Sequence, residues 1–369
     1  MLKKEIKMAH RIWNFNPGPA TLPLPVLEKA REEIPDYNGT GMAVMELSHR
    51  SKEYAEIHER AKSLLIELFG IPENYKVLFL QGGASLQFAM VPMNLLTQDR
   101  SADYIITGSW SKKAIKEATI IGKANVAASS EEDNFNRIPR ADELKLDPNA
   151  VYLHITSNNT IAGTQWQSFP ESGGVPIVAD MSSDILSRRI DWSNFGLIYA
   201  GAQKNLGPSG VTVVIIRDDL VEMSRDDIPT LLKYKTHVEK DSTFNTPPTY
   251  SVYLMKLVLE WVKDKGGLES IEKENREKAQ LLYSTIDAHK DFYRGTVEPE
   301  SRSLMNATFR LPTEELEAEF ISQAKSAGFG GLKGHRSVGG IRVSMYNAMP
   351  LKGVEELAEF MNDFVKKNG

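Results

Sequence analysis

The sequence predicts an α/β protein with a large, doubly wound and mostly parallel sheet, followed by a smaller α+β unit. Two observations support this fold class. From Tyr75 to about Arg217, short runs of β-branched and aromatic residues alternate with stretches of helical character, as in a parallel sheet whose strands are joined by helices. The chain has 369 residues, which is more than one typical domain, so we expect two.

The predicted large unit begins with helices and continues with strands. Proline in the first turn predicts a helix over 25–34, and the spacing of apolar residues over 54–69 predicts an amphipathic second helix. Short apolar runs then predict strands at 77–80, 104–107, 125–127, 150–154, 176–179, 197–200 and 211–216.

A smaller unit follows a predicted helix stop. The helix predicted from 249 to about 265 ends at Gly266-Gly267, because glycine commonly terminates helices, and we take this pair as the hinge. The rest predicts a helix over 268–289, a strand over 305–311, a helix over 314–327, a strand over 340–344 and a final helix from Lys352. The predicted organisation is a large domain over 12–265, a small α+β domain over 266–369 and an N-terminal extension over 1–11, to which no function is assigned.

Composition excludes several classes of function. The formal net charge is −5, so there is no overall positive field for nucleic acid or an anionic membrane. No apolar run approaches the roughly 18 to 20 residues of a membrane span, and the first residues lack a signal core, so we expect a cytoplasmic protein. The chain has no cysteine, which excludes disulfides, thiolate metal sites and cysteine nucleophiles. We predict no metal site.

Lys204 and Asp180 follow two consecutive predicted strands, at the strand ends where open α/β sheets bind ligands. Apolar surroundings would lower the pKa of the Lys204 amine and make it a nucleophile toward an aldehyde. The pair suits pyridoxal phosphate, because the lysine can hold the aldehyde while the acid keeps the pyridine nitrogen protonated. Taken singly, an ordinary loop lysine and a helix-capping aspartate are the more common roles.

Three further turns can complete such a site. Gln81-Gly-Gly-Ala-Ser85 links a strand to a helix, so its backbone N–H groups face a bound phosphate, although such a turn often has no ligand. It lacks the glycine patterns of dinucleotide and ATP sites. Trp110 follows a strand and can stack on a flat heterocycle, to which Thr160 can hydrogen-bond. Core packing and a polar turn are the alternative roles of these two residues.

Cationic side chains recur in two pairs, His49-Arg50 and His335-Arg336, with Arg342 as a further arginine. An arginine bound to a carboxylate or phosphate contributes roughly 1.5 to 3 kcal/mol per hydrogen bond, so several together would select a doubly anionic substrate. Glycines around the second pair predict a mobile loop that closes on a ligand. For any single pair, a solvated surface is the more common role.

These segments resemble the phosphoserine aminotransferase family, whose members are pyridoxal phosphate enzymes of the aspartate aminotransferase fold type. The resemblance runs nearly end to end and implies a PLP-dependent transferase fold. It rests on NFNPGPATLP at 14–23, ELSHRS at 46–51, GGAS at 82–85, GSW at 108–110, VADMSS at 178–183, YAGAQKNLGPSG at 199–210, NTPPT at 245–249 and GHRSVGGIRVS at 334–344.

The resemblance also implies roles for individual residues. Lys204 would form the Schiff base with pyridoxal phosphate, Asp180 would pair with the pyridinium and Trp110 would stack on the ring. Further implied cofactor contacts are Ala84, Ser85, Thr160 and Gln203, with Asn245 and Thr246 reaching the cofactor of a neighbouring subunit. That contact implies a homodimer with active sites at the subunit interface. Arg342 would hold the substrate α-carboxylate, and the distal phosphate or the γ-carboxylate of glutamate would be held by His49, Arg50, His335 and Arg336.

The implied reaction transfers the amino group of L-glutamate to 3-phosphohydroxypyruvate, giving O-phospho-L-serine and 2-oxoglutarate. A related step in the pyridoxine route of some bacteria is left open. So is the share of phosphate binding borne by the arginines, because some family members carry an arginine where this chain has Ala84-Ser85.

Other functions on this fold suit the sequence less well. The alternative is another aminotransferase of this fold, of the serine–glyoxylate or alanine–glyoxylate type. The substrates of such enzymes have small uncharged side chains, which do not require two His-Arg pairs in addition to Arg342. A cysteine desulfurase would require a thiolate, which this chain lacks. A binding protein on this fold need not keep Lys204, and a dinucleotide dehydrogenase would need the missing glycine pattern.

Overall fold

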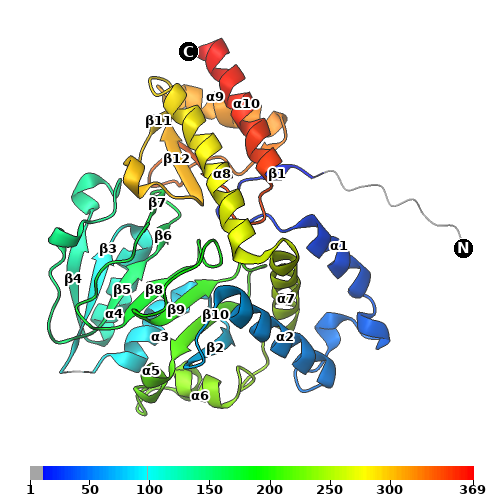
Figure 1. The fold of residues 1–369 in the computed structure, drawn as a ribbon, viewed down its shortest axis with the longest axis vertical. Helices are drawn as coiled ribbons and strands as arrows, with labels where there is room; N and C mark the ends of the chain where they lie inside the picture. Colours follow the sequence, from blue (N-terminus) through cyan, green and yellow to red (C-terminus); the bar gives the residue numbers. More distant parts are fainter. Residues whose placement is uncertain (1–10, 98) are drawn as a thin grey trace, which may run out of the picture.

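The structure is a computed structural model that describes residues 11–97 and 99–369 (Figure 1). Apart from Arg11, the predicted N-terminal extension lies outside the described residues. Within the described residues, no helix combines the length and the apolar character needed to cross a membrane. The helices are α1 (Leu24–Glu33), α2 (Lys52–Phe69), α3 (Gly83–Leu95), α4 (Ser109–Ile121), α5 (Asp218–Glu222), α6 (Tyr234–Glu239), α7 (Thr249–Asp264), α8 (Gly267–Ala288), α9 (Glu314–Ser326) and α10 (Leu351–Asn368).

The central sheet has seven strands in the order β2-β10-β9-β8-β5-β3-β4. Only β10 runs antiparallel to its neighbours, β2 and β9, and the other pairs are parallel, so the predicted mostly parallel sheet is confirmed. The strands are β2 (Tyr75–Leu80), β3 (Ser101–Ile106), β4 (Lys123–Ser129), β5 (Ala150–Thr156), β8 (Ile177–Asp180), β9 (Phe195–Gly201) and β10 (Thr212–Arg217).

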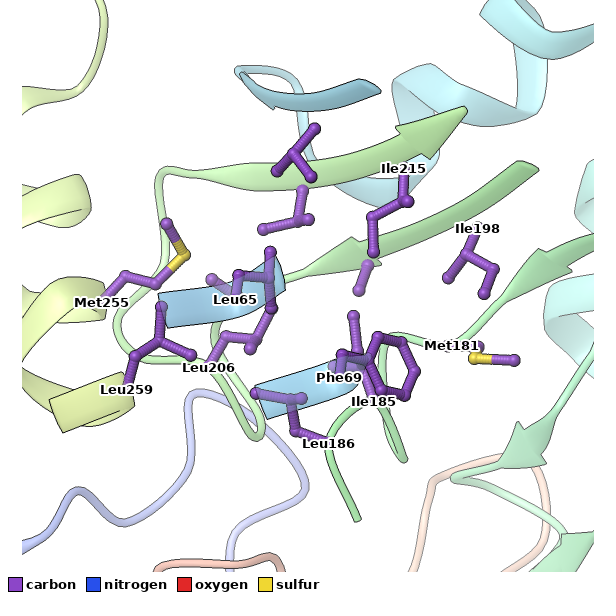
Figure 2. Packing of buried hydrophobic residues seen from close by; sticks show 14 of the residues in the cluster. Leu65, Phe69, Met181, Ile185, Leu186, Ile198, Leu206, Ile215, Met255 and Leu259 are labelled. Carbon is purple, nitrogen blue, oxygen red and sulfur yellow. The ribbon is translucent and has the colours of Figure 1, made fainter. Parts of the chain in front are cut away.

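Helices cover both faces of this sheet, and each strand alternates between the two faces. On β9, Ile198 belongs to the core packed under α2 and α7, whereas Leu197 and Tyr199 belong to the core packed under α3 and α4. Figure 2 shows the first of these cores, with Leu65 from α2 and Met255 from α7 near the strands. Burial on both faces explains why the strand sequences are continuously apolar.

A third, smaller core lies around a three-stranded antiparallel sheet with the order β11-β12-β14. The strands of this region are β11 (Arg294–Gly295), β12 (Asn306–Arg310), β13 (Phe329–Gly330) and β14 (Ile341–Ser344). Helix α8 connects this small core to the core under α2 and α7. Leu268, near its start, lies in the core under α2 and α7, and Leu282 lies in the small core. The division into two domains near Gly266 stays a prediction.

The segment around Trp13 was predicted to belong to the large domain, but it packs against the small core. Strand β1 (Trp13–Asn14) pairs in parallel with β13, and Phe15 is buried in the small core. The prediction placed this stretch in the large domain because it is close in sequence to α1. Backbone hydrogen bonds from Trp13 and Phe15 to Gly328 and Gly330 attach it to the C-terminal unit instead.

The sheet topology decides where the candidate residues meet. Strands β3, β5, β8 and β9 are parallel, and β2 has the same direction because β10 is antiparallel to both β2 and β9. All five strands therefore end at one edge, where open α/β sheets bind ligands. The turns that follow them begin near Gln81, Gly108, Ser157, Met181 and Ala202.

Candidate active site

Thr160 joins two of the predicted site residues. It lies in the turn between the short strands β6 (Asn158–Asn159) and β7 (Thr164–Gln165) and is buried. Lys204 Nζ donates to Thr160 Oγ1 at 2.7 Å, and Arg342 Nη1 lies 3.4 Å from Thr160 O. Three segments that are distant in sequence thus meet at one point beyond the strand ends.

The environment of Lys204 favours a neutral amine. Burial of the ammonium lowers the pKa of Lys204 to about 8, against the opposing charge of Asp180 and with the help of the nearby Arg342. An ordinary lysine is almost fully protonated at neutral pH. Lys204 therefore offers a larger fraction of the nucleophilic form, as predicted for an amine that attacks an aldehyde.

Asp180 ends β8, and its carboxylate is held by the next turn. Oδ1 accepts hydrogen bonds from the backbone N–H of Ser182 at 2.9 Å and from its hydroxyl at 2.6 Å. Burial raises the pKa of Asp180 above its ordinary value, and these hydrogen bonds and the charge of Lys204 oppose the rise. A buried carboxylate of this kind is best kept ionised by a cationic partner.

The glycine turn after β2 has the form of a phosphate cradle. Gly82 and Gly83 adopt left-handed backbone angles, with φ of 87° and 65°, and α3 begins without a side-chain cap. Ala84 and Ser85 lie in the first turn of this helix, where free N–H groups attract anions. The Asn245 side chain donates to Gln81 at 2.8 Å, and the Gln81 side chain donates to Thr246 O at 2.7 Å. Asn245 and Thr246 therefore lie beside Gln81 of their own chain, and their predicted contact with the cofactor of a neighbouring subunit stays a prediction.

Trp110 lies in the first turn of α4, beyond the end of β3. Its Nε1 is buried and has no hydrogen-bond partner among the described residues. Lys113 Nζ lies 4.4 Å from the centroid of the Trp110 ring. Lys113 is not among the residues predicted from the sequence, although its spacing of three residues from Trp110 places both on one side of the helix.

Arg342 and the His335-Arg336 pair form a cationic region on the side of the small unit. Arg342 lies on β14 and is only 6% exposed, and its Nε is buried without a partner among the described residues. Burial, Arg342, Arg336 and Lys113 together lower the pKa of His335. Among the described residues, no carboxylate forms an ion pair with the Arg342 guanidinium. A buried guanidinium in this situation is suited to bind an anionic ligand.

His49 and Arg50 are not brought to this region by the single chain. They lie in the turn before α2, and Arg50 is exposed. Within residues 11–97 and 99–369, no recorded hydrogen bond or ion pair joins them to Lys204 or Arg342. Their predicted role in substrate binding stays a prediction.

The N-terminal segment contributes contacts that we did not predict. A Cβ at Gly18 would lie 3.1 Å from Lys204 Cγ, so the backbone at Gly18 lies directly against the lysine stem. Ala20 N donates to Gln203 O at 2.9 Å, and the hydroxyl of Tyr346 donates to Pro17 O at 2.7 Å. The only sequence signal was the NFNPGP run, which we used for the resemblance alone.

Comparison with known proteins identifies the family of this chain. Residues 12–357 match the family model described as aminotransferase class-V. A phosphoserine aminotransferase of Lysinibacillus sphaericus (strain C3-41) is 56% identical over 361 residues, which cover 98% of this chain and 100% of the relative. The chain belongs to the phosphoserine aminotransferase family. This membership confirms the resemblance and makes the chain a class-V aminotransferase.

Solved structures of phosphoserine aminotransferases share the fold. The enzyme from Bacillus circulans subsp. alkalophilus is 54% identical, with a TM-score of 0.96 and coverage of 98% of this chain and 100% of that one. The enzyme from Trichomonas vaginalis, solved with bound PLP, is 37% identical, with a TM-score of 0.91 and coverage of 95% and 100%. The predicted PLP-dependent transferase fold is confirmed.

The residues of this phosphoserine aminotransferase family member fit pyridoxal phosphate. Asp180 is a buried carboxylate that calls for a cationic partner, as a protonated pyridine nitrogen would be. The uncapped start of α3 offers N–H groups to a phosphate, and Lys204 offers an amine of lowered pKa to an aldehyde. The partnerless indole N–H of Trp110 leaves a hydrogen bond for a ligand to complete.

Proposed function

We propose that this chain transfers the amino group of L-glutamate to 3-phosphohydroxypyruvate, giving O-phospho-L-serine and 2-oxoglutarate, with pyridoxal phosphate as cofactor. One observation carries the proposal. Lys204 and the buried Arg342 meet at Thr160, with His335, Arg336 and Lys113 near the same side. A reactive amine beside several cations suits a substrate with two anionic groups.

The cofactor is held by residues from five strand ends. When bound, pyridoxal phosphate supplies an aldehyde that takes up an amine and a protonated ring that withdraws electrons from the substrate's α-carbon. Lys204 would hold the aldehyde, Asp180 would pair with the ring nitrogen and Trp110 would cover the ring. The first N–H groups of α3, at Ala84 and Ser85, hold the phosphate, and Thr160 and Gln203 make further contacts.

Lys204 would have a second task besides holding the cofactor. Its Nζ would take the proton from the substrate's α-carbon as a general base and would later give a proton back as a general acid. Thr160 Oγ1, at 2.7 Å, keeps the amine near this position. Arg342 binds the α-carboxylate, and this orients the C–H bond toward the lysine.

A homodimer completes the site in this proposal. His49 and Arg50 of one chain supply cations to the other, and Asn245 and Thr246 reach the other cofactor's phosphate. Exposed apolar side chains accompany both segments, with Met45 52% and Phe244 45% exposed. Apolar side chains exposed around polar site residues suit a subunit interface. We propose the cytoplasm as the location, from composition.

Substrate preference tests the proposed function. The purified protein is expected to aminate 3-phosphohydroxypyruvate from glutamate with a far higher kcat/KM than pyruvate or glyoxylate. Arg336→Ala should lower kcat/KM for phosphohydroxypyruvate about 10- to 100-fold, the equivalent of one lost charged hydrogen bond, and should spare alanine. Arg189→Ala, which removes an exposed arginine paired with Glu269, is the matched control and should change neither rate. Equal rates with phosphorylated and unphosphorylated keto acids would contradict the proposal.

The pKa of Lys204 predicts how cofactor uptake depends on pH. Because burial lowers this pKa to about 8, the rate of covalent pyridoxal phosphate attachment to the apoprotein should rise with pH and level off above about pH 8. The unfolded chain keeps the ordinary value near 10.5 and binds more protons between these two values, so stability of the apoprotein should also rise there. Stopped-flow absorbance and thermal melts measure both. An uptake rate that still climbs at pH 10 would show an unperturbed lysine.

A further inference from the structure

The loop that carries His335 and Arg336 has a closed neck. Lys333 and Ile341 form a β-bridge, and Gly334 N donates to Gly340 O at 2.8 Å. A Cβ at Gly334 would lie 1.9 Å from Gly339 O, so the two legs approach closely only with glycine there. The neck therefore connects the loop directly to the start of β14, where Arg342 is the second residue.

The tip of this loop is held mainly by its own hydrogen bonds. Val338 N and Gly339 N donate to His335 O at 2.9 and 2.8 Å, and the His335 ring lies 2.7 Å from Ser337 Oγ. Arg336 and Ser337 are exposed. The tip is thus a small turn whose position depends on the legs that carry it.

The returning leg, residues 338–340, is attached to an ion pair between Arg310 and Glu317. Glu317 lies on α9 and is only 6% exposed, and its carboxylate accepts hydrogen bonds from the Arg310 guanidinium and from Gly340 N at 3.2 Å. Arg310 Nη1 donates to Val338 O at 3.1 Å. The pair therefore binds both an N–H and a carbonyl of this leg.

The fit between this leg and the ion pair is close. Gly340 has a φ of 67°, and a Cβ there would lie 2.5 Å from Arg310 Cδ. Glu317 also accepts from Leu311 N at 3.3 Å, so its buried charge is satisfied from three directions. Removing such a charge leaves its donors unpaired, and the leg then loses its fixed position.

We propose that the Arg310–Glu317 pair is a latch that positions His335 and Arg336 for the distal anion of the substrate. The inference rests on the proposed function, in which this loop binds that anion. The pair lies behind the loop and contacts neither Lys204 nor Asp180 in the recorded hydrogen bonds of the described residues. It therefore acts on substrate affinity and leaves cofactor binding and the proton transfer unchanged.

Glu317→Gln in the holoenzyme tests the latch, because glutamine keeps the shape of the side chain and removes its charge. If the loop is correctly placed only a tenth of the time, KM for phosphohydroxypyruvate and for glutamate rises about tenfold, while kcat stays within about twofold. Trypsin should also cut faster after Arg336, as measured by mass spectrometry of the fragments. The visible spectrum of the bound cofactor should not change.

Asp287→Asn is the matched control. It breaks the pair between Asp287 and Arg302, which is bidentate at 2.7 Å and lies in the same unit away from the loop. KM and the cleavage rate after Arg336 should equal those of the wild type. Arg310→Lys, which keeps the charge opposite Glu317 and loses the planar fork, should give an intermediate KM even if Glu317→Gln folds poorly.

Two outcomes would overturn the latch. One is unchanged cleavage after Arg336 in folded Glu317→Gln, and the other is faster cleavage with an unchanged KM. The cleavage measurement needs no substrate, so it tests the latch even if the wild type fails to aminate phosphohydroxypyruvate. That failure would count against the proposed function and not against the attachment of the loop.

Discussion

Lys204→Ala is expected to abolish transamination, with kcat lowered about 10⁴-fold or more, because in the proposed mechanism this one side chain both holds the cofactor and moves the α-proton. Alanine removes the amine that lies 2.7 Å from Thr160 Oγ1, and the described residues place no other lysine amine at that hydroxyl. Borohydride reduction followed by peptide mass spectrometry measures the loss directly. The wild type should yield a labelled peptide containing Lys204, and the variant none.

Lys204→Arg is the control that distinguishes the positive charge at this position from the reactivity of the neutral amine. Arginine keeps a cation near Asp180 but stays protonated at every accessible pH, so it can neither attack an aldehyde nor accept a proton. It should be as inactive as the alanine variant. An active arginine variant, or a borohydride label on another lysine, would show that Lys204 has been misassigned.

Asp180→Asn is expected to give the second largest loss, about 10²- to 10³-fold in kcat, in the range found when one group that stabilises developing charge is removed. Asparagine retains an oxygen for the two hydrogen bonds from Ser182, so the turn after β8 should keep its geometry. What is lost is the negative charge that keeps the ring nitrogen protonated. Steady-state kinetics and the pH dependence of the cofactor spectrum measure this loss.

Asp180→Glu tests whether charge alone is sufficient. Glutamate keeps the carboxylate but displaces it by one methylene in a fully buried position, so it should recover part of the activity lost in Asp180→Asn. Because burial raises the pKa of Asp180, the wild type should lose activity at low pH, where the carboxylate becomes protonated, and the difference between the wild type and Asp180→Asn should become smaller there. Full activity in Asp180→Asn would remove Asp180 from the mechanism.

The strands and their order along the chain were predictable because each is a short, continuously apolar run. Parallel strands that are buried on both faces show this pattern, as at 197–200 and 211–216. The antiparallel direction of β10 was not predictable, since apolar runs are alike in both directions. The position of Trp13 and Phe15 against the small core was also missed, because it depends on pairing with residues more than 300 positions away.

Lys204 and Asp180 could be predicted from the sequence because each directly follows a buried strand. A ligand-binding edge forms wherever parallel strands end together, so chemistry placed after such runs is visible in a single chain. The glycine turn at Gly82-Gly83 was visible for the same reason. The roles of Gly18 and Glu317 were not, because nothing beside them in sequence indicates Lys204 or the loop of Arg336, which they contact. The position of Lys113 beside Trp110 could have been predicted from their spacing of three residues on a helix.

Local sequence was sufficient for the fold class and for the predictions of a reactive lysine and an anionic ligand, since these depend on periodicity and on residue type at strand ends. The contacts between residues that are far apart in sequence were decided only by the tertiary structure. Only the folded chain joins Lys204 to Arg342 through Thr160, and only there does Glu317 attach to the loop of Arg336. Such contacts follow from how two cores pack against each other, and no window of neighbouring residues contains that information.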